Sequence, residues 1–84
     1  MVVHIGGIIS KDIYKIKKLC EKKNIYLIED SAQAHGSSLY GKKAGSFGIA
    51  SGFSFFSTKV MTTGEGGMVT TSNKAILGKI RSMR

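Results

Sequence analysis

Two short segments of the sequence carry side chains suited to chemistry, and the first of them ends at Lys59. This lysine follows a hydroxyl-rich stretch, Ser54 to Thr58, which comes directly after a candidate strand. A lysine at the partly apolar end of a strand can have its pKa lowered, which exposes a nucleophilic amine for Schiff-base chemistry. Most lysines are solvated surface cations. Residue type and position alone leave both interpretations of Lys59 open.

The second segment begins at Asp30, just beyond the end of a candidate buried strand. In open α/β sheets, ligands bind at the carboxyl ends of the strands. A buried acid is costly unless it is paired with a positive group, and an aspartate that caps a turn is the alternative. Gln33 and His35 follow in the same loop, where each can either bind a ligand or satisfy loop backbone groups.

Several familiar catalytic sites do not match the sequence. The Gly64–Gly67 stretch neither opens a helix after a strand nor has the Walker pattern, so it is not a phosphate-binding loop. His35 with Asp30 and Ser31 could suggest a hydrolase triad, but no G-x-S-x-G elbow accompanies them. No cluster of cysteine and histidine has zinc spacing, so no metal site is expected.

The elements that must position these side chains follow an α/β pattern. Hydrophobic runs predict strands at Val2–Ile5, Ile25–Ile28, Ile49–Phe56 and Met68–Thr71. Helices are expected between the first two strands, with Ser10 as the cap and Asn24 as a left-handed stop, and from Asn73 onward. The continuous apolar run of Ile25–Ile28 predicts a strand buried on both faces, as in parallel sheets. The small, polar Ser31–Gly48 segment is expected to be a glycine-rich connection.

Length and composition restrict the chain to one small domain of ordinary globular type. It has 84 residues, 42% of them hydrophobic and 21% charged, and a single cysteine, Cys20. A core of this size supplies only about 3–5 kcal/mol without a disulfide or metal. The lone cysteine fits a reducing, cytoplasmic location. No apolar run is long enough to span a membrane, and the first residues do not resemble a signal peptide.

The net charge of +8 makes nucleic acid or another anionic partner a second possibility. The lysines concentrate between Lys11 and Lys23, where a solvated helix face is the simpler interpretation. Binding of nucleic acid would favour aromatic residues interleaved with these cations, and Tyr14 is the only one there. A non-catalytic basic module stays the alternative to an enzyme.

Taken together, four segments closely resemble the DegT/DnrJ/StrS family of pyridoxal-phosphate (PLP)-dependent aminotransferases of nucleotide-linked sugars. In chain order they are IEDSAQAHG (28–36), GKKAGSFG (41–48), FSFFSTK (53–59) and GEGGMVTT (64–71). Val2–His4 and the helix after it also look like the segment that precedes the acidic motif in the family. The resemblance therefore covers almost the whole chain.

The resemblance implies roles for four residues. Lys59 matches the lysine that joins PLP covalently and acts as general base and acid. Asp30 matches the aspartate that pairs with the pyridine nitrogen and keeps it protonated. Ser54 matches the serine that contacts the cofactor phosphate, and Gln33 matches the residue that lies against the ring. The motifs also contain residues to which no role is assigned: Ser31, His35, Ser57 (where many relatives have proline) and Glu65.

The resemblance also implies an enzyme larger than this chain. Family members aminate a keto-sugar nucleotide with a glutamate-type amino donor, in polysaccharide or lipopolysaccharide biosynthesis, as dimers with active sites at the subunit interface. Lys59 argues against the dehydratase-like branch of the family, in which a histidine replaces the lysine. Residues 1–84 are then expected to be a fragment of the PLP-binding large domain, a partial, mostly parallel sheet with flanking helices. Alone, such a fragment should have little or no activity.

Overall fold

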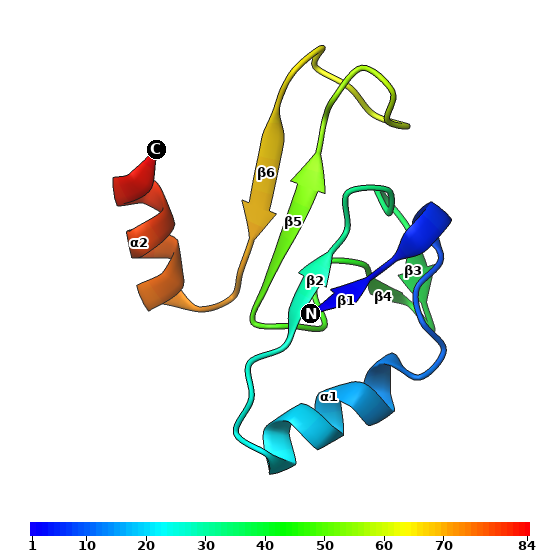
Figure 1. Ribbon diagram of the computed structural model, residues 1–84, viewed down its shortest axis with the longest axis vertical. Helices are drawn as coiled ribbons and strands as arrows, with labels where there is room; N and C mark the ends of the chain where they lie inside the picture. The colour runs from blue at the N-terminus through cyan, green and yellow to red at the C-terminus, as the bar shows by residue number, and fades with distance from the viewer.

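The structure of the protein is a computed structural model that describes all 84 residues. The fold is built on a four-stranded sheet (Figure 1). Its strands are β1 (Val2–Val3), β2 (Ile28–Asp30), β5 (Ala50–Ser54) and β6 (Gly67–Thr70), in the order β1-β2-β5-β6. The first three strands in this order are parallel, and β6 pairs antiparallel with β5. The expected α/β fold with a mixed, mostly parallel sheet is confirmed.

Two α-helices flank the sheet and lie well apart from each other (Figure 1). Helix α1 (Ile13–Lys22) joins β1 to β2, and Asn24 ends the helical segment with a φ of 54°, as expected of a left-handed stop. Ser10 is not the cap: Asp12 holds that position, and its N–H donates to the Ser10 hydroxyl at 3.3 Å. Helix α2 (Lys74–Met83) begins after Asn73, whose side chain accepts from the Ile76 N–H at 3.0 Å.

The expected first strand is too long by two residues. It ends at Val3, because Ile5–Gly7 forms a short 3-10 helix in which Gly6 has a φ of 63°. Backbone positions with such positive φ values are most easily occupied by glycine, which has no Cβ atom. The chain thus turns away from the sheet directly after His4, which places Gly6 near the end of β2.

The Ser31–Gly48 segment contains a hairpin that the sequence pattern did not indicate. Strands β3 (Ser38–Leu39) and β4 (Lys42–Lys43) pair antiparallel across Tyr40 and Gly41. Both turn residues have positive φ, 49° and 78°, as a tight hairpin turn requires. Tyr40 is not a typical residue there, which is why the pattern was missed.

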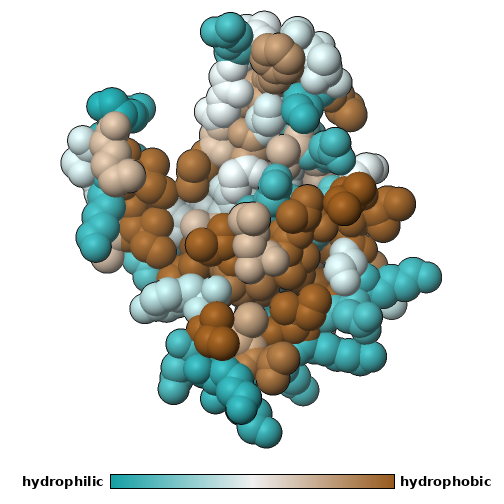
Figure 2. All heavy atoms as spheres, in the orientation of Figure 1, coloured by the Kyte–Doolittle hydropathy of each residue, from teal (hydrophilic) through white to brown (hydrophobic).

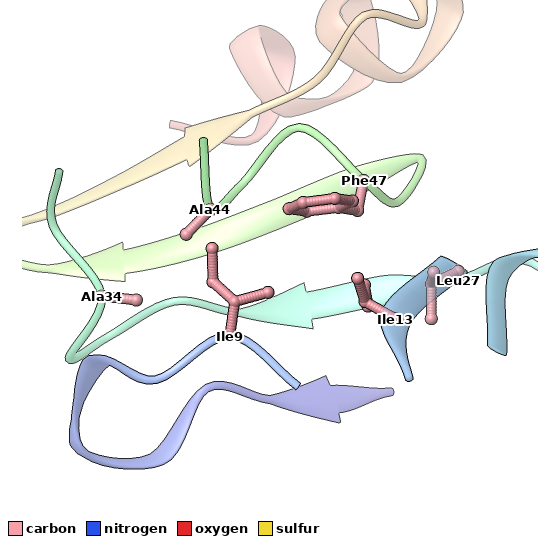
Figure 3. Close-up of a cluster of buried hydrophobic side chains, with 6 residues drawn as sticks. All are labelled: Ile9, Ile13, Leu27, Ala34, Ala44 and Phe47. Carbon is pink, nitrogen blue, oxygen red and sulfur yellow. The ribbon is translucent and has the colours of Figure 1, made fainter. Parts of the chain in front are cut away.

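The core is small and lies on one side of the sheet. Ten residues are buried, and the apolar ones form the cluster in Figure 3: Ile9, Ile13, Leu27, Ala34, Ala44 and Phe47. The expected strand at Ile25–Ile28, buried on both faces, is wrong for this chain, because β2 begins only at Ile28 and ends at Asp30. Only Leu27 is buried, whereas Tyr26 is 77% and Ile28 45% exposed. Figure 2 shows a broad apolar area across the middle of the molecule, with hydrophilic residues around it.

Candidate active site

The carboxyl end of β2 presents Asp30 in a fixed orientation. The Asp30 Oδ1 atom accepts a hydrogen bond from the Ala32 N–H at 3.0 Å, and its carbonyl oxygen accepts from the His4 N–H at 3.0 Å. The next residue, Ser31, continues the ladder by donating its N–H to the Gly52 carbonyl at 2.9 Å. The second carboxylate oxygen, Oδ2, accepts no hydrogen bond and stays available to a ligand.

Three of the four predicted site residues line one hollow of about 340 Å³ beside this strand end: Asp30, Gln33 and Lys59. Gln33 is anchored there, because its Oε1 accepts from the Gly6 N–H at 2.7 Å. The Lys59 amine makes no ion pair or hydrogen bond, and Lys59 also lines an adjoining hollow with Gln33 and Gly6. Residues from three separate segments of the chain are thus brought together.

Ser54, the fourth predicted residue, lies apart from Lys59. It ends β5, opposite Gly67, and lines a different hollow together with Asp30 and Gly52. The Ser54 hydroxyl oxygen accepts from the Phe56 N–H at 3.3 Å, so its own proton is free to be donated. The structure therefore places Ser54 near Asp30, while no hollow contains both Ser54 and Lys59.

A buried acid that the sequence reasoning passed over lies directly before Asp30. Glu29 is 1% exposed, and its Oε1 accepts from His4 Nε2 at 3.0 Å and from the Gly45 N–H at 2.8 Å. Its Oε2 accepts from the N–H groups of Phe47 (2.8 Å) and Gly48 (2.7 Å). Burial raises the pKa of Glu29, but these four hydrogen bonds outweigh it and leave the pKa below its ordinary value.

A signal for Glu29 was present in the sequence. Side chains alternate between the faces of a strand, so an Asp30 that faces a ligand requires its neighbour Glu29 to face the core. A buried acid then needs donors, and the glycine-containing Gly41–Gly48 segment offers backbone N–H groups.

The four motif residues without an assigned role differ in burial, and His35 is half-buried. Ser31 is buried and its hydroxyl pairs with that of Ser51 at 2.8 Å. The His35 ring packs near Phe53 and Phe55, with centroids 5.5 and 5.2 Å away, and neither of its nitrogens has a hydrogen-bond partner. Ser57 and Glu65 are exposed.

The basic helix gives little support to the nucleic-acid alternative. Lys15 is exposed and pairs with Asp12 at 3.1 Å. Tyr14, the only aromatic residue of α1, packs edge-on against Phe47 with ring centroids 5.5 Å apart. The one aromatic side chain of the helix thus packs partly against the fold, and 40% of it stays exposed.

Comparison with known proteins relates this geometry to a family. The family model of the DegT/DnrJ/EryC1/StrS aminotransferases matches residues 1–84. The chain belongs to this aminotransferase family. Among curated relatives, GDP-perosamine synthase of Vibrio cholerae is 48% identical over 79 residues, which cover 94% of this chain and 21% of the relative.

Solved structures of aminotransferases and a dehydratase share the fold of the chain. An aminotransferase from Psychrobacter cryohalolentis superposes with a TM-score of 0.91 at 43% identity, covering 96% of this chain and 21% of that one. The GDP-4-keto-6-deoxy-D-mannose-3-dehydratase of E. coli, solved with bound hydrated PLP, has a TM-score of 0.88 at 28% identity, covering 99% and 21%. The chain thus spans about a fifth of the length of these proteins. None of its helices is long and apolar enough to cross a membrane.

Proposed function

We propose that residues 1–84 form part of the PLP-binding large domain of an aminotransferase that transfers an amino group from a glutamate-type donor to a keto-sugar nucleotide. The observation that carries the proposal is the shared hollow lined by Asp30, Gln33 and Lys59 at the carboxyl end of β2. Family membership supports the reaction class. The GDP in the name of the Vibrio cholerae relative supports a nucleotide-linked substrate.

The side chains in and beside the hollow fit PLP. The free Oδ2 of Asp30 can accept a hydrogen bond from a protonated pyridine nitrogen, and the unpaired Lys59 amine can bind the cofactor covalently. Gln33, held by Gly6, can lie against the ring, and the Ser54 hydroxyl can donate to a phosphate oxygen. When bound, PLP supplies the electron sink for carbon–hydrogen bond cleavage.

Each residue then has a task that follows from its chemistry. The Asp30 carboxylate favours the protonated form of the ring nitrogen beside it. The Lys59 amine, when not bound to the cofactor, would take a proton from the substrate carbon as general base and deliver it to a carbon of the cofactor as general acid. Gln33 and Ser54 orient the ring and the phosphate, so that the substrate carbon lies within reach of Lys59.

Lys59 also favours amination over the dehydration reaction of the E. coli neighbour. In the dehydratase-like branch a histidine stands at the lysine position, whereas this chain has Lys59 in the FSFFSTK segment. The proposal includes a homodimeric enzyme in the cytoplasm, acting in polysaccharide or lipopolysaccharide biosynthesis. The free Cys20 is consistent with that reducing location.

The isolated 84 residues are proposed to have little or no transaminase activity. Lys59 is only half-buried, and few residues are buried in total. A site open to water weakens the electrostatic interactions on which such chemistry depends. Binding of the cofactor is therefore the property to measure on this chain.

The absorbance of the purified chain mixed with PLP tests the assignment. We expect a borohydride-reducible band that disappears in Lys59→Ala and persists in Lys11→Ala, which removes an exposed lysine outside the hollow. Asp30→Asn should shift the pH at which the band changes, because the ring nitrogen loses its carboxylate. A band of equal strength in Lys59→Ala would show that Lys59 does not have the proposed role.

A further inference from the structure

Glu29 is the most heavily hydrogen-bonded side chain of the chain, and the proposed function gives it no task. Its two carboxylate oxygens accept from four donors at 2.7 to 3.0 Å. Three of the donors are backbone N–H groups within Gly45–Gly48, and the fourth is the ring of His4. Both side chains of the His4–Glu29 pair are fully shielded from solvent.

The same network holds the backbone from which Asp30 extends. His4 contacts two consecutive residues of β2. Its ring donates to Glu29, and its backbone N–H donates to the Asp30 carbonyl oxygen at 3.0 Å. Ser51, on the adjacent strand, donates its hydroxyl to the Glu29 carbonyl oxygen at 3.1 Å. Glu29 and Asp30 point to opposite faces of the sheet. The Glu29 network therefore holds the β2 backbone from the face opposite to the Asp30 side chain.

We propose that Glu29 and His4 form a buried clamp that fixes the direction of the Asp30 carboxylate, which makes Glu29 a positioning residue for the site. This inference rests on the proposed function, in which Asp30 contacts the cofactor ring. The clamp joins three parts of the chain: the residue after β1, the strand β2, and the Gly45–Gly48 segment. A tilt of β2 would require these hydrogen bonds to break together.

The donor pattern demands a carboxylate at this position. A glutamine has one accepting oxygen and one NH₂ group, so at least one backbone N–H of the Gly45–Gly48 segment would face another donor even if His4 Nε2 became an acceptor. The Gly45–Gly48 segment has little room to adjust, because a Cβ atom at Gly48 would collide with the Leu27 carbonyl group. Ile49 also donates its N–H to that carbonyl oxygen at 2.8 Å. Glu29→Gln should therefore move β2 rather than the segment behind it.

The Ala32 amide reports on the direction of Asp30, because it donates to Asp30 Oδ1. In a pH titration of the 84-residue chain followed by NMR, its chemical shift should follow the ionisation of Asp30, and Asp30→Asn should abolish that component. We expect Glu29→Gln to reduce this component at least twofold. Glu21→Gln, which removes an equal charge from the exposed side of α1, should leave it unchanged. A folded Glu29→Gln chain with the full Ala32 response would overturn the clamp.

Hydrogen exchange in the unsubstituted chain keeps the proposal testable if Glu29→Gln fails to fold. The clamp predicts that the amides of Gly45, Phe47, Gly48 and Ala32 are protected to within about threefold of one another, since they open as one unit. An Ala32 amide that exchanges at least tenfold faster than the other three would contradict it.

Neither measurement contains PLP, so the two proposals can fail separately. If the PLP band survives in Lys59→Ala while Ala32 responds as expected, the proposed function is wrong and the clamp on Asp30 still exists. If the band depends on Lys59 but Glu29→Gln leaves both the Ala32 response and the pH dependence of the band unchanged, Glu29 is not a positioning residue.

Discussion

The two sides of the candidate site are built in different ways. Asp30 lies at the end of a strand whose neighbours are buried, and Glu29, His4 and Ser31 are each at most 1% exposed. The Lys59 side consists of Phe56–Gly66, where Val60 is 87% and Met61 57% exposed. One half of the site is anchored in the core, and the other half extends away from it.

The hydrogen bonds of the Lys59 side are local. The Lys59 N–H donates to the Phe56 carbonyl at 3.0 Å, and Thr62 donates its hydroxyl to the Phe55 carbonyl at 2.9 Å. None of these groups contacts the buried cluster. The comparison indicates that buried hydrogen bonds hold the backbone at Asp30, whereas only local hydrogen bonds hold the segment that carries Lys59.

The largest effect is expected on the anchored side. Glu29→Ala leaves four donors without an acceptor, and removing one partner of a buried pair costs about 3–5 kcal/mol. Since an 84-residue core supplies a similar amount, the variant should be largely unfolded by circular dichroism. Glu21→Ala is the matched control. A Glu29→Ala chain as stable as this control would show that Glu29 does not anchor the Asp30 side of the site.

The second-largest effect is a loss of stability at acidic pH, caused by protonation of Glu29 on the anchored side. The pKa of Glu29 is lowered in the folded chain, so its stabilising contribution is present above its ordinary value of 4.5 and is lost as the pH falls through the lowered value. Urea denaturation between pH 6 and pH 3 should show this loss. Glu29→Gln should flatten the dependence and Glu21→Gln should not. An equal pH dependence in all three chains would contradict the assignment.

A matched pair of hydroxyl removals compares the two sides directly. Ser51→Ala removes a hydrogen-bond partner from the buried Ser31 hydroxyl and from the Glu29 carbonyl oxygen. It should lower the free energy of unfolding by about 1–2 kcal/mol. Thr62→Val removes exposed hydrogen bonds to Phe55 and Gly64 and should cost at most about 0.5 kcal/mol. Urea titration gives the free energy of unfolding of both variants. Equal losses in Ser51→Ala and Thr62→Val would contradict the difference between the Asp30 side and the Lys59 side.

The smallest change in stability is expected at the lysine itself. The Lys59 amine makes no hydrogen bond or ion pair in the chain, so Lys59→Ala should alter the free energy of unfolding by less than about 0.5 kcal/mol. The same substitution should abolish the PLP band. A large loss of stability in thermal denaturation would show that Lys59 is part of the folded core rather than free to react.

The sequence predicted the anchored side better than its surroundings. The apolar run Ile25–Ile28 indicated a parallel strand in this region, but the strand lies two to three residues later, at Ile28–Asp30, and contains Asp30 as its last residue. The Glu29 network was missed, since its donors come from Gly45–Gly48 and His4, which only the folded chain brings together. Burial of Ile28 was overestimated for a related reason: a strand pattern does not show which faces of the sheet this chain covers.

Site-resolved labelling with PLP tests the central claim most directly. The chain is treated with less than one equivalent of PLP, reduced with borohydride, digested and mapped by mass spectrometry. The account predicts that most of the label lies on Lys59, and that Asp30→Asn reduces this label while Lys11→Ala does not. Label spread evenly over the exposed lysines of α1 would contradict a PLP site at the end of β2.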